Sequence, residues 1–371
     1  MDADSKNVGK SSGRHRVSKY VWVVGGFVTS LFLGMMWLQG RGVFVQFNTR
    51  GSGGDMDPVV RPEVETNRPI IGVLTVPVEM DDKCVTRRRM RRLSDEKEDT
   101  SCFHSPYVKW IEAAGGRVVP IPFDASLNRT VELLKHVNGV LFTGGDTPVK
   151  QIHSGYMERS RFILDYVIRE NLESSYFPLW GTCMGIQTLS VLVGGPDVLE
   201  YHIFSGVDPQ MMSLTFTEEA KSSKMFSRQV LPVSIEKWMK TEPVTTNFHH
   251  DGMDPESFKV NSNLSSFFRV TTTNIDKKGR PFVSTIEARD FPIYGVQWHP
   301  ERPQFHFFRT AAEDPVNHDI AAVQVNAWTA SFFINEARRN ARHFPTAEEE
   351  EAALIYNHVP RGKTANQIYY F

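Results

Sequence analysis

Cys183 stands between Gly181 and Gly185, where a short apolar run gives way to a helical pattern. The run before it, 177–180, is apolar and bounded by turn residues, as buried strands are. The run after it, 184–193, spaces its apolar residues as a helix does and stops at a glycine pair. The sequence therefore predicts a sharp strand-to-helix turn with a thiol at its apex.

A turn of the form G-x-nucleophile-x-G holds its central residue in a strained conformation above the end of a sheet. Glycine is needed at 181 and 185 because neighbouring backbone comes too close there for a side chain, and we call the segment 181–185 the elbow. The amides and the dipole of the helix start favour a thiolate. We therefore expect the pKa of Cys183 to lie below that of a free thiol. The alternative is a buried structural cysteine, because free cysteines are among the most buried residues.

His299 and Glu301 are the candidate partners of this thiol. They follow the apolar strand pattern of 294–298, with Pro300 restricting the backbone between them. An imidazole can accept the thiol proton and pass it to a leaving amine, while a carboxylate orients the ring and stabilises its cation. In isolation, a surface His-Pro-Glu turn is the simpler interpretation.

A third strand pattern, 140–142, ends in paired glycines at Gly144 and Gly145. Paired glycines occur in any tight turn, so they are weak evidence alone. With the elbow and the His-Pro-Glu segment, in this order and spacing, they resemble the class I glutamine amidotransferase-like superfamily. That superfamily uses a Cys-His-Glu triad.

Within the superfamily the resemblance is to gamma-glutamyl hydrolases, also called folylpolyglutamate hydrolases. It rests on segments from about residue 68 onward: RPIIGVLTVP, YVKWIEAAGGRVVPI, NGVLFTGGD, PLWGTCMGIQTLS, NFHHDG, YGVQWHPE and SFFINEARRN. Trp298 favours the hydrolases, because amidotransferase subunits usually carry phenylalanine there. The chain departs from the family after Glu301, since the run 302–308 lacks the expected acidic-tryptophan pair.

The resemblance implies a three-layer α/β sandwich with a mostly parallel central sheet. It also implies a role for each matching residue: catalysis for Cys183, His299 and Glu301, oxyanion binding for Gly145 and Met184, and substrate binding for His249, Gly144 and Trp298. His250 leaves the histidine assignment open by one residue. We expect no cofactor and no metal in the reaction, because the histidines lack the spacing of metal ligands.

Composition is that of an ordinary globular chain. The 371 residues are 40% hydrophobic and carry a net charge of -1, which argues against nucleic acid as the main partner because a nucleic-acid-binding chain carries a basic patch. Strand and helix patterns alternate from Pro69 to Trp180, as in a single α/β domain. We assign 68–371 to the catalytic domain, with a charged insertion at 81–104.

The first forty residues follow another pattern. A basic segment, 1–19, precedes an uncharged run, 20–39, that is long enough to cross a bilayer and lacks a clear cleavage site. The basic flank should stay cytosolic, so we expect a signal anchor, with a cleaved signal peptide as the alternative. The segment 40–67 is typical of a linker.

Further features fit export to the secretory pathway, with the lysosomal or vacuolar lumen or the cell exterior as destination. Asn128 and Asn263 begin glycosylation acceptor sequences. Cys84 and Cys102 flank the charged insertion and could pair in an oxidising lumen, closing a loop of about twenty residues and contributing on the order of 3 kcal/mol. The alternative is two unpaired thiols on a solvated loop.

Patterns near the C-terminus predict a helix over 320–342, a helical turn at 348–351, and an apolar tail that lies back on the domain. Our first interpretation of the chain is a lumenal cysteine hydrolase of gamma-glutamyl bonds. Its small-molecule substrates would be folylpoly-gamma-glutamates or gamma-glutamyl peptides. Whether the chain forms a homodimer is left open by the sequence. The alternatives are a glutamine amidotransferase domain that releases ammonia, and a non-catalytic membrane glycoprotein of the same fold.

Overall fold

The computed structural model describes residues 64–80, 84, 99–173, 175–204, 210–308, 310–311, 313–362 and 367–371. The expected basic segment, anchor, most of the linker and most of the charged insertion lie outside these residues. Among the helices of the described part, none combines the length and apolar character needed to cross a bilayer.

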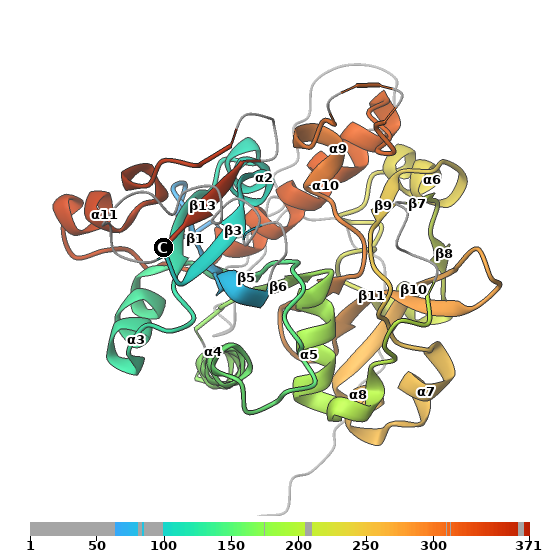
Figure 1. Cartoon of the computed structure of the whole chain (residues 1–371), viewed down its shortest axis with the longest axis horizontal. Helices are drawn as coiled ribbons and strands as arrows, with labels where there is room; N and C mark the ends of the chain where they lie inside the picture. The colour runs from blue at the N-terminus through green and yellow to red at the C-terminus, as the bar shows by residue number, and fades with distance from the viewer. Residues whose placement is uncertain are drawn as a thin grey trace, which may run out of the picture. The chain divides into compact units, whose positions relative to one another are not determined.

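A central eight-stranded sheet organises the catalytic domain (Figure 1). Its strands, in spatial order, are β4 (Arg117–Ile121), β1 (Ile70–Leu74), β5 (Gly139–Phe142), β6 (Leu179–Thr182), β12 (Ile293–Val296), β11 (Pro281–Ala288), β10 (Phe268–Ile275) and β8 (Thr215–Phe216). Neighbours from β4 to β12 pair in parallel, and those from β12 to β8 pair antiparallel. The predicted α/β fold with a mostly parallel central sheet is confirmed.

Side chains of alternate strand residues enter two separate cores. Ile70 and Leu74 of β1 belong to one hydrophobic cluster, whereas Ile71 and Val73 belong to the other. All five residues of β1 are buried, which is typical of a parallel strand covered on both faces. The two clusters therefore mark the two faces of the sheet.

Helices cover both of these faces. The first cluster includes residues of α3 (Leu127–His136), α4 (Gly155–Leu172), α5 (Met184–Gly194), α7 (Pro255–Val260) and α8 (Ser262–Phe267). The second includes residues of α2 (Ser105–Ala113), α6 (Val233–Thr241) and α10 (Ile320–Ala337). Figure 1 shows α4 and α5 side by side below the sheet, and α5 leads directly from β6.

Smaller elements complete the domain. Two further sheets join β13 (Ile368–Tyr370), β3 (Ser101–His104) and β2 (Val76–Pro77), and β7 (Gln210–Met212) with β9 (Thr245–Asn247). The remaining helical segments are α9 (Arg302–Phe305), α11 (Ala347–Ala353), η1 (Val78–Met80), η2 (Pro196–Val198), η3 (Glu218–Ser222) and η4 (Ile355–Asn357). Because β13 pairs with β3, the expectation that the C-terminal tail lies back on the domain is confirmed.

The predicted helix over 320–342 is shorter in the structure and ends at Ala337. Beyond it, the carbonyls of Asn340 and Arg342 each accept a hydrogen bond of 2.8 Å from the Asn138 side chain. Asn138 precedes β5, and its side-chain Oδ1 accepts a hydrogen bond from the backbone amide of Ile70. The backbone after Ala337 thus leaves the helix to bind the start of the central sheet.

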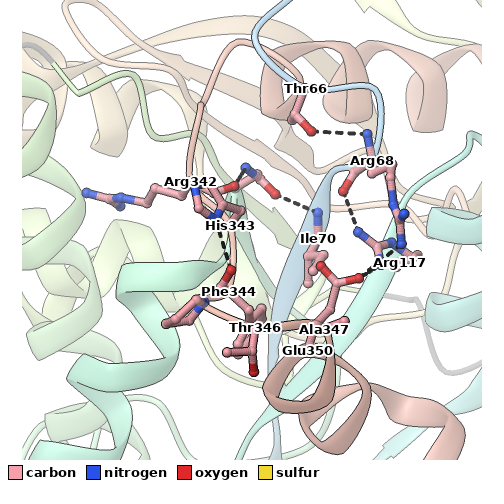
Figure 2. Close-up of a pocket in the computed structure, with 12 residues that line it drawn as sticks. Thr66, Arg68, Ile70, Arg117, Arg342, His343, Phe344, Thr346, Ala347 and Glu350 are labelled. Carbon is pink, nitrogen blue, oxygen red and sulfur yellow. Dashed lines mark hydrogen bonds and ion pairs between the residues drawn. The ribbon is translucent and has the colours of Figure 1, made fainter.

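A hollow of about 320 Å³ lies at the amino ends of β1 and β4 (Figure 2). Arg68 and Arg117 approach each other there and both pair with Glu350 of α11. The charges of this hollow are therefore used to fasten α11 and the chain entering β1 to the sheet.

Candidate active site

Cys183 sits at the apex of the elbow, between β6 and α5. Its φ of 53° and ψ of -106° are strained for a residue with a side chain. A Cβ on Gly185 would lie 2.3 Å from the carbonyl oxygen of Phe142, and one on Gly181 would lie 2.7 Å from the carbonyl carbon of Gly185. Only glycine fits at these two positions, as the sequence pattern predicts.

His299 and Glu301 lie beyond the carboxyl end of β12, the strand beside β6. The Nδ1 of His299 is 2.7 Å from the Oε1 of Glu301, and both side chains are buried. A Cβ on Gly144 would lie 3.0 Å from His299 Cε1 and 3.3 Å from Cys183 Cβ. The imidazole and the thiol thus converge over Gly144, from loops after three neighbouring parallel strands.

Charge around Glu301 keeps its carboxyl ionised. Burial by itself raises the pKa of Glu301, but the charge interactions with His299 and Arg302 and the His299 hydrogen bond outweigh it, so the pKa lies below its ordinary value. An ionised Glu301 can stabilise a positively charged His299 ring. This is the electrostatic requirement for His299 to act as a base.

The expected low pKa of the Cys183 thiol is wrong in direction. Burial raises this pKa to about 12, against the opposing effects of the Arg302 guanidinium and the Met184 amide. Removal from water disfavours the charged thiolate more strongly than these two groups favour it. The thiol of the free protein therefore stays protonated, and a base must take its proton as it attacks.

The backbone amides near Cys183 divide between two uses. The Gly144 amide donates a hydrogen bond of 2.8 Å to the hydroxyl of Tyr107, so this amide is already used within the protein, and the expected substrate contact at Gly144 stays a prediction. Gly145 follows with a half-exposed backbone, and the Met184 amide hydrogen-bonds the Cys183 sulfur. The Met184 side chain lies against Gly145, and the oxyanion hole expected from the amides of Gly145 and Met184 stays a prediction.

His249, rather than His250, faces the interior beside the catalytic residues. His249 is buried, and its Nδ1 is 2.9 Å from the carbonyl oxygen of Asp251. Burial, together with the nearby His299, lowers the pKa of His249 to about 4, so its ring is neutral above that pH. Because His250 is only half-buried, His249 is the histidine of this pair that lies in the interior, and its contact with substrate stays a prediction.

Trp298 does not line the site as expected. Its side chain is fully buried in the hydrophobic core, and its indole N–H points to the hydroxyl of Thr285 at 3.4 Å. A side chain with no exposed surface cannot contact a substrate. Trp298 instead anchors the chain that leads from β12 to His299.

Two functional candidates, Tyr107 and Arg302, escaped the sequence analysis. Tyr107 lies on α2, far from the elbow in sequence, and orients Gly144 through its hydroxyl. Arg302 is buried and stacks on the Phe248 ring with its guanidinium 4.6 Å from the ring centroid. The only sequence signal for Arg302 was its position next to Glu301, in the run that departs from the family.

The remaining predicted sites lie away from the elbow. Cys84 and Cys102 form a disulfide bond, in the arrangement that the sequence left as one of two alternatives. Asn128, in the first turn of α3, and Asn263, in the first turn of α8, are both exposed. Whether either asparagine carries a glycan stays a prediction.

A thiol, an imidazole and a buried carboxylate, gathered at the carboxyl edge of a mostly parallel sheet, are the groups that cysteine hydrolases of the α/β class use. The sequence comparisons give the family. Residues 82–301 match the model of the family described as Peptidase C26. The chain belongs to this family.

Several curated relatives share most of their length with this chain. Human gamma-glutamyl hydrolase is 36% identical, over 81% of this chain and 87% of the relative. Gamma-glutamyl hydrolase B of Dictyostelium discoideum is 33% identical, over 82% and 83%. Gamma-glutamyl hydrolase 1 of Arabidopsis thaliana is 31% identical, over 86% and 88%.

A solved structure described as a GMP synthase subunit from Thermoplasma acidophilum is also similar. The two sequences are 14% identical. The structural match covers 73% of this chain and 98% of the other chain, with a TM-score of 0.38.

Proposed function

We propose that this chain hydrolyses gamma-glutamyl amide bonds through a Cys183 acyl-enzyme, with folate poly-gamma-glutamates as the substrate class. The observation that carries the proposal is the convergence of Cys183 and His299 over Gly144, with Glu301 bonded to the far side of the ring. The curated relatives, named as gamma-glutamyl hydrolases, supply the bond type.

In the proposed reaction, the Cys183 sulfur attacks the gamma-carbonyl carbon while His299 takes the thiol proton. The amides of Gly145 and Met184 donate to the oxyanion that forms. His299 then returns the proton to the leaving amine, the C–N bond breaks, and a thioester remains. Water, deprotonated by His299, attacks the thioester and releases the acid and the free thiol. Glu301 stabilises the His299 cation in both steps.

Arg302 is our candidate for binding a carboxylate of the glutamyl tail. Its Nε and Nη1 make no hydrogen bond within the described residues, although burial makes an unsatisfied guanidinium costly. Its charge also acts on Cys183. Both nitrogens are shielded from solvent in the free protein, and Nε lies 3.8 Å from the Oε1 of Glu301. A substrate carboxylate near the thiol would therefore bind them with charge-assisted hydrogen bonds once the covering side chains move aside.

The test is hydrolysis of pteroyl-penta-gamma-glutamate by the purified protein, with an alpha-linked glutamyl peptide and free glutamine offered separately. We expect glutamate or gamma-glutamyl fragments from the first substrate only, without a second protein. Cys183→Ala should lower kcat/KM by several orders of magnitude at an unchanged melting temperature. His299→Asn should lower it nearly as far, and Glu301→Gln less.

His136→Asn is the matched control. The His136 ring also makes a hydrogen bond, between its Nδ1 and the carbonyl oxygen of His343, but it lies at the end of α3, away from the elbow. The kcat/KM of this variant should equal that of the wild type. Release of ammonia from glutamine without cleavage of gamma-glutamyl chains would instead favour the amidotransferase. A folded protein active on none of the substrates would favour the non-catalytic alternative.

We also propose that the catalytic domain resides in the lumen of the secretory pathway or outside the cell. The disulfide between Cys84 and Cys102 supports this location, because such bonds persist in oxidising compartments. The exposed Asn128 and Asn263 support it as well. A loss of apparent mass after endoglycosidase treatment, absent in Asn128→Gln/Asn263→Gln, checks it, and full digestion by protease added to sealed microsomes would contradict it.

A further inference from the structure

His202, His250 and Asp251 form a cluster of metal-binding side chains on the surface, outside the catalytic residues. His202 comes from the loop after η2, and the other two come from the loop after β9. An antiparallel bridge between Glu200 and Gly252 ties the two loops together. The backbone thus brings together residues that lie about fifty positions apart in sequence.

Further hydrogen bonds set the relative position of the two loops. The amide of Phe204 donates a hydrogen bond of 3.1 Å to the carbonyl oxygen of His250. The amide of His202 donates one of 2.8 Å to the Oδ1 of Asp251. His202 has a φ of 54°, a conformation uncommon for a residue with a side chain. With this conformation, the His202 ring stacks on the His250 ring, at 4.6 Å between centroids and 11° between planes.

The distances suit one shared ion better than direct hydrogen bonds. His202 Nδ1 and His250 Nε2 lie 3.8 Å and 3.9 Å from Asp251 Oδ1, too far for hydrogen bonds. The three ligand atoms all lie within 4.8 Å of one another. Ligands at 2.0–2.1 Å from a tetrahedral ion are about 3.4 Å apart. Binding therefore requires the exposed His202 ring to rotate out of its stack on His250, so that both in-plane lone pairs meet the ion, and His250 and Asp251 to approach by about 0.5 Å.

We propose that His202, His250 and Asp251 bind a divalent transition-metal ion such as Zn²⁺. Two imidazoles and one carboxylate favour such ions, whereas Ca²⁺ and Mg²⁺ prefer sites made of oxygen ligands. The His202 side chain is 76% exposed, so the ion has access from solvent, and three protein ligands leave a position for water.

The site adjoins the loop that carries His249. The carbonyl of Asp251 bonds both the Nδ1 of His249, at 2.9 Å, and the side-chain amide of Gln187, at 2.9 Å. An ion on the carboxylate of Asp251 therefore holds the same residue whose backbone positions His249. Because an ion that binds only the folded protein stabilises it, Zn²⁺ should raise the melting temperature.

The experiment is calorimetric titration of the full chain, freed of metals by chelation, with ZnCl₂, and a parallel titration with Co²⁺ followed by visible absorption. We expect one ion per chain and a rise in melting temperature. Partners that only orient metal ligands are worth roughly 10–100-fold in affinity. His250→Ala and Asp251→Asn should therefore each weaken binding by at least about 100-fold, and His202→Ala likewise.

Two controls separate this site from others. His153→Ala removes an exposed histidine elsewhere on the described surface and should leave the affinity unchanged. Cys183→Ala should also leave it unchanged, which excludes zinc held by the catalytic thiol. Metal-free His202→Ala should have the same melting temperature as the metal-free wild type, which shows that it folds. Wild-type affinity in both His202→Ala and His250→Ala, loss in Cys183→Ala, or no binding at about 1 mM Zn²⁺ would each overturn the proposal.

Discussion

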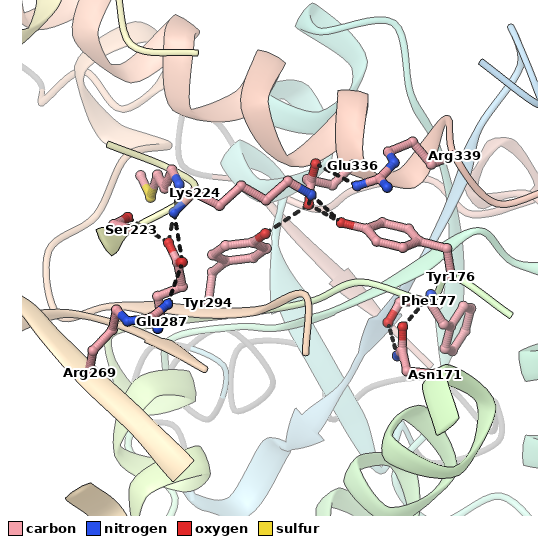
Figure 3. Close-up of polar contacts among 11 residues, drawn as sticks. Asn171, Tyr176, Phe177, Ser223, Lys224, Arg269, Glu287, Tyr294, Glu336 and Arg339 are labelled. Carbon is pink, nitrogen blue, oxygen red and sulfur yellow. Dashed lines mark hydrogen bonds and ion pairs between the residues drawn. The ribbon is translucent and has the colours of Figure 1, made fainter. Parts of the chain in front are cut away.

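Glu301 and Glu336 are both buried carboxylates, but they lie at opposite edges of the parallel strands and differ in how their oxygens are used. Glu336, at the amino edge, accepts hydrogen bonds from Lys224, Tyr176 and Tyr294 (Figure 3). Glu301, at the carboxyl edge, bonds His299 through Oε1, while its Oε2 has no hydrogen-bond partner in the described part of the chain.

The cations beside the two carboxylates differ in the same way. Lys224 is 2.6 Å from Glu336 and from the Tyr176 hydroxyl, whereas two nitrogens of Arg302 make no hydrogen bond within the described residues. Buried polar groups are normally satisfied. The Glu336 carboxylate is therefore held by three donors, whereas Arg302 and the Oε2 of Glu301 keep hydrogen-bonding capacity.

The sharpest test of this contrast is Arg302→Met, which keeps a long apolar side chain and removes the charge. If Arg302 binds a substrate carboxylate, kcat/KM should fall about 10–100-fold, because hydrogen bonds to a charged group are worth about 1.5–3 kcal/mol. The loss should appear mainly in KM, and Arg302→Lys should recover part of it. Steady-state kinetics measure both parameters, and a fall in kcat at constant KM would argue against carboxylate binding.

A substitution of Glu336, at the amino edge of the strands, should lower the stability of the protein and leave its activity unchanged. Glu336→Gln removes the buried charge to which Lys224, Tyr176 and Tyr294 donate hydrogen bonds. Because the Lys224 side chain is 41% exposed, we expect the free energy of unfolding to fall by only about 1 kcal/mol. The kcat/KM of the folded protein should stay within about twofold. Glu256→Gln, in an exposed pair with Lys259, is the control and should leave denaturant unfolding unchanged. A catalytic defect in Glu336→Gln would break the comparison.

The smallest expected effect concerns His249 and pH. Its pKa falls from 6.5 in the unfolded chain to about 4 in the folded one, so between these values the unfolded state binds more protons. Stability then decreases as the pH falls through this window, by about 1 kcal/mol from pH 7 to 5.5 for this group. His249→Gln should lose that part of the decline. Urea unfolding at several pH values measures it, and parallel curves for the two proteins would contradict it.

The strands and the elbow were predictable from sequence because their causes are local. Gly181 and Gly185 are glycines since backbone from the same few residues and from Phe142 approaches them, a constraint that the G-x-C-x-G pattern already expresses. The strand predicted at 177–180 lies at Leu179–Thr182 in the structure. This shift arises because pairing with β5 and β12, rather than composition, sets where a strand begins.

By itself, then, the sequence determined the elbow, the order of the three catalytic candidates and the α/β class, each through spacing along the chain. Only the tertiary structure decided that the Cys183 thiol is protonated, that Trp298 is a core residue, and that Arg302 keeps unsatisfied nitrogens. It also brought His202 beside Asp251. The physical reason is that burial and charge interactions depend on distance through space, and they sum over segments that the sequence separates by tens to hundreds of residues.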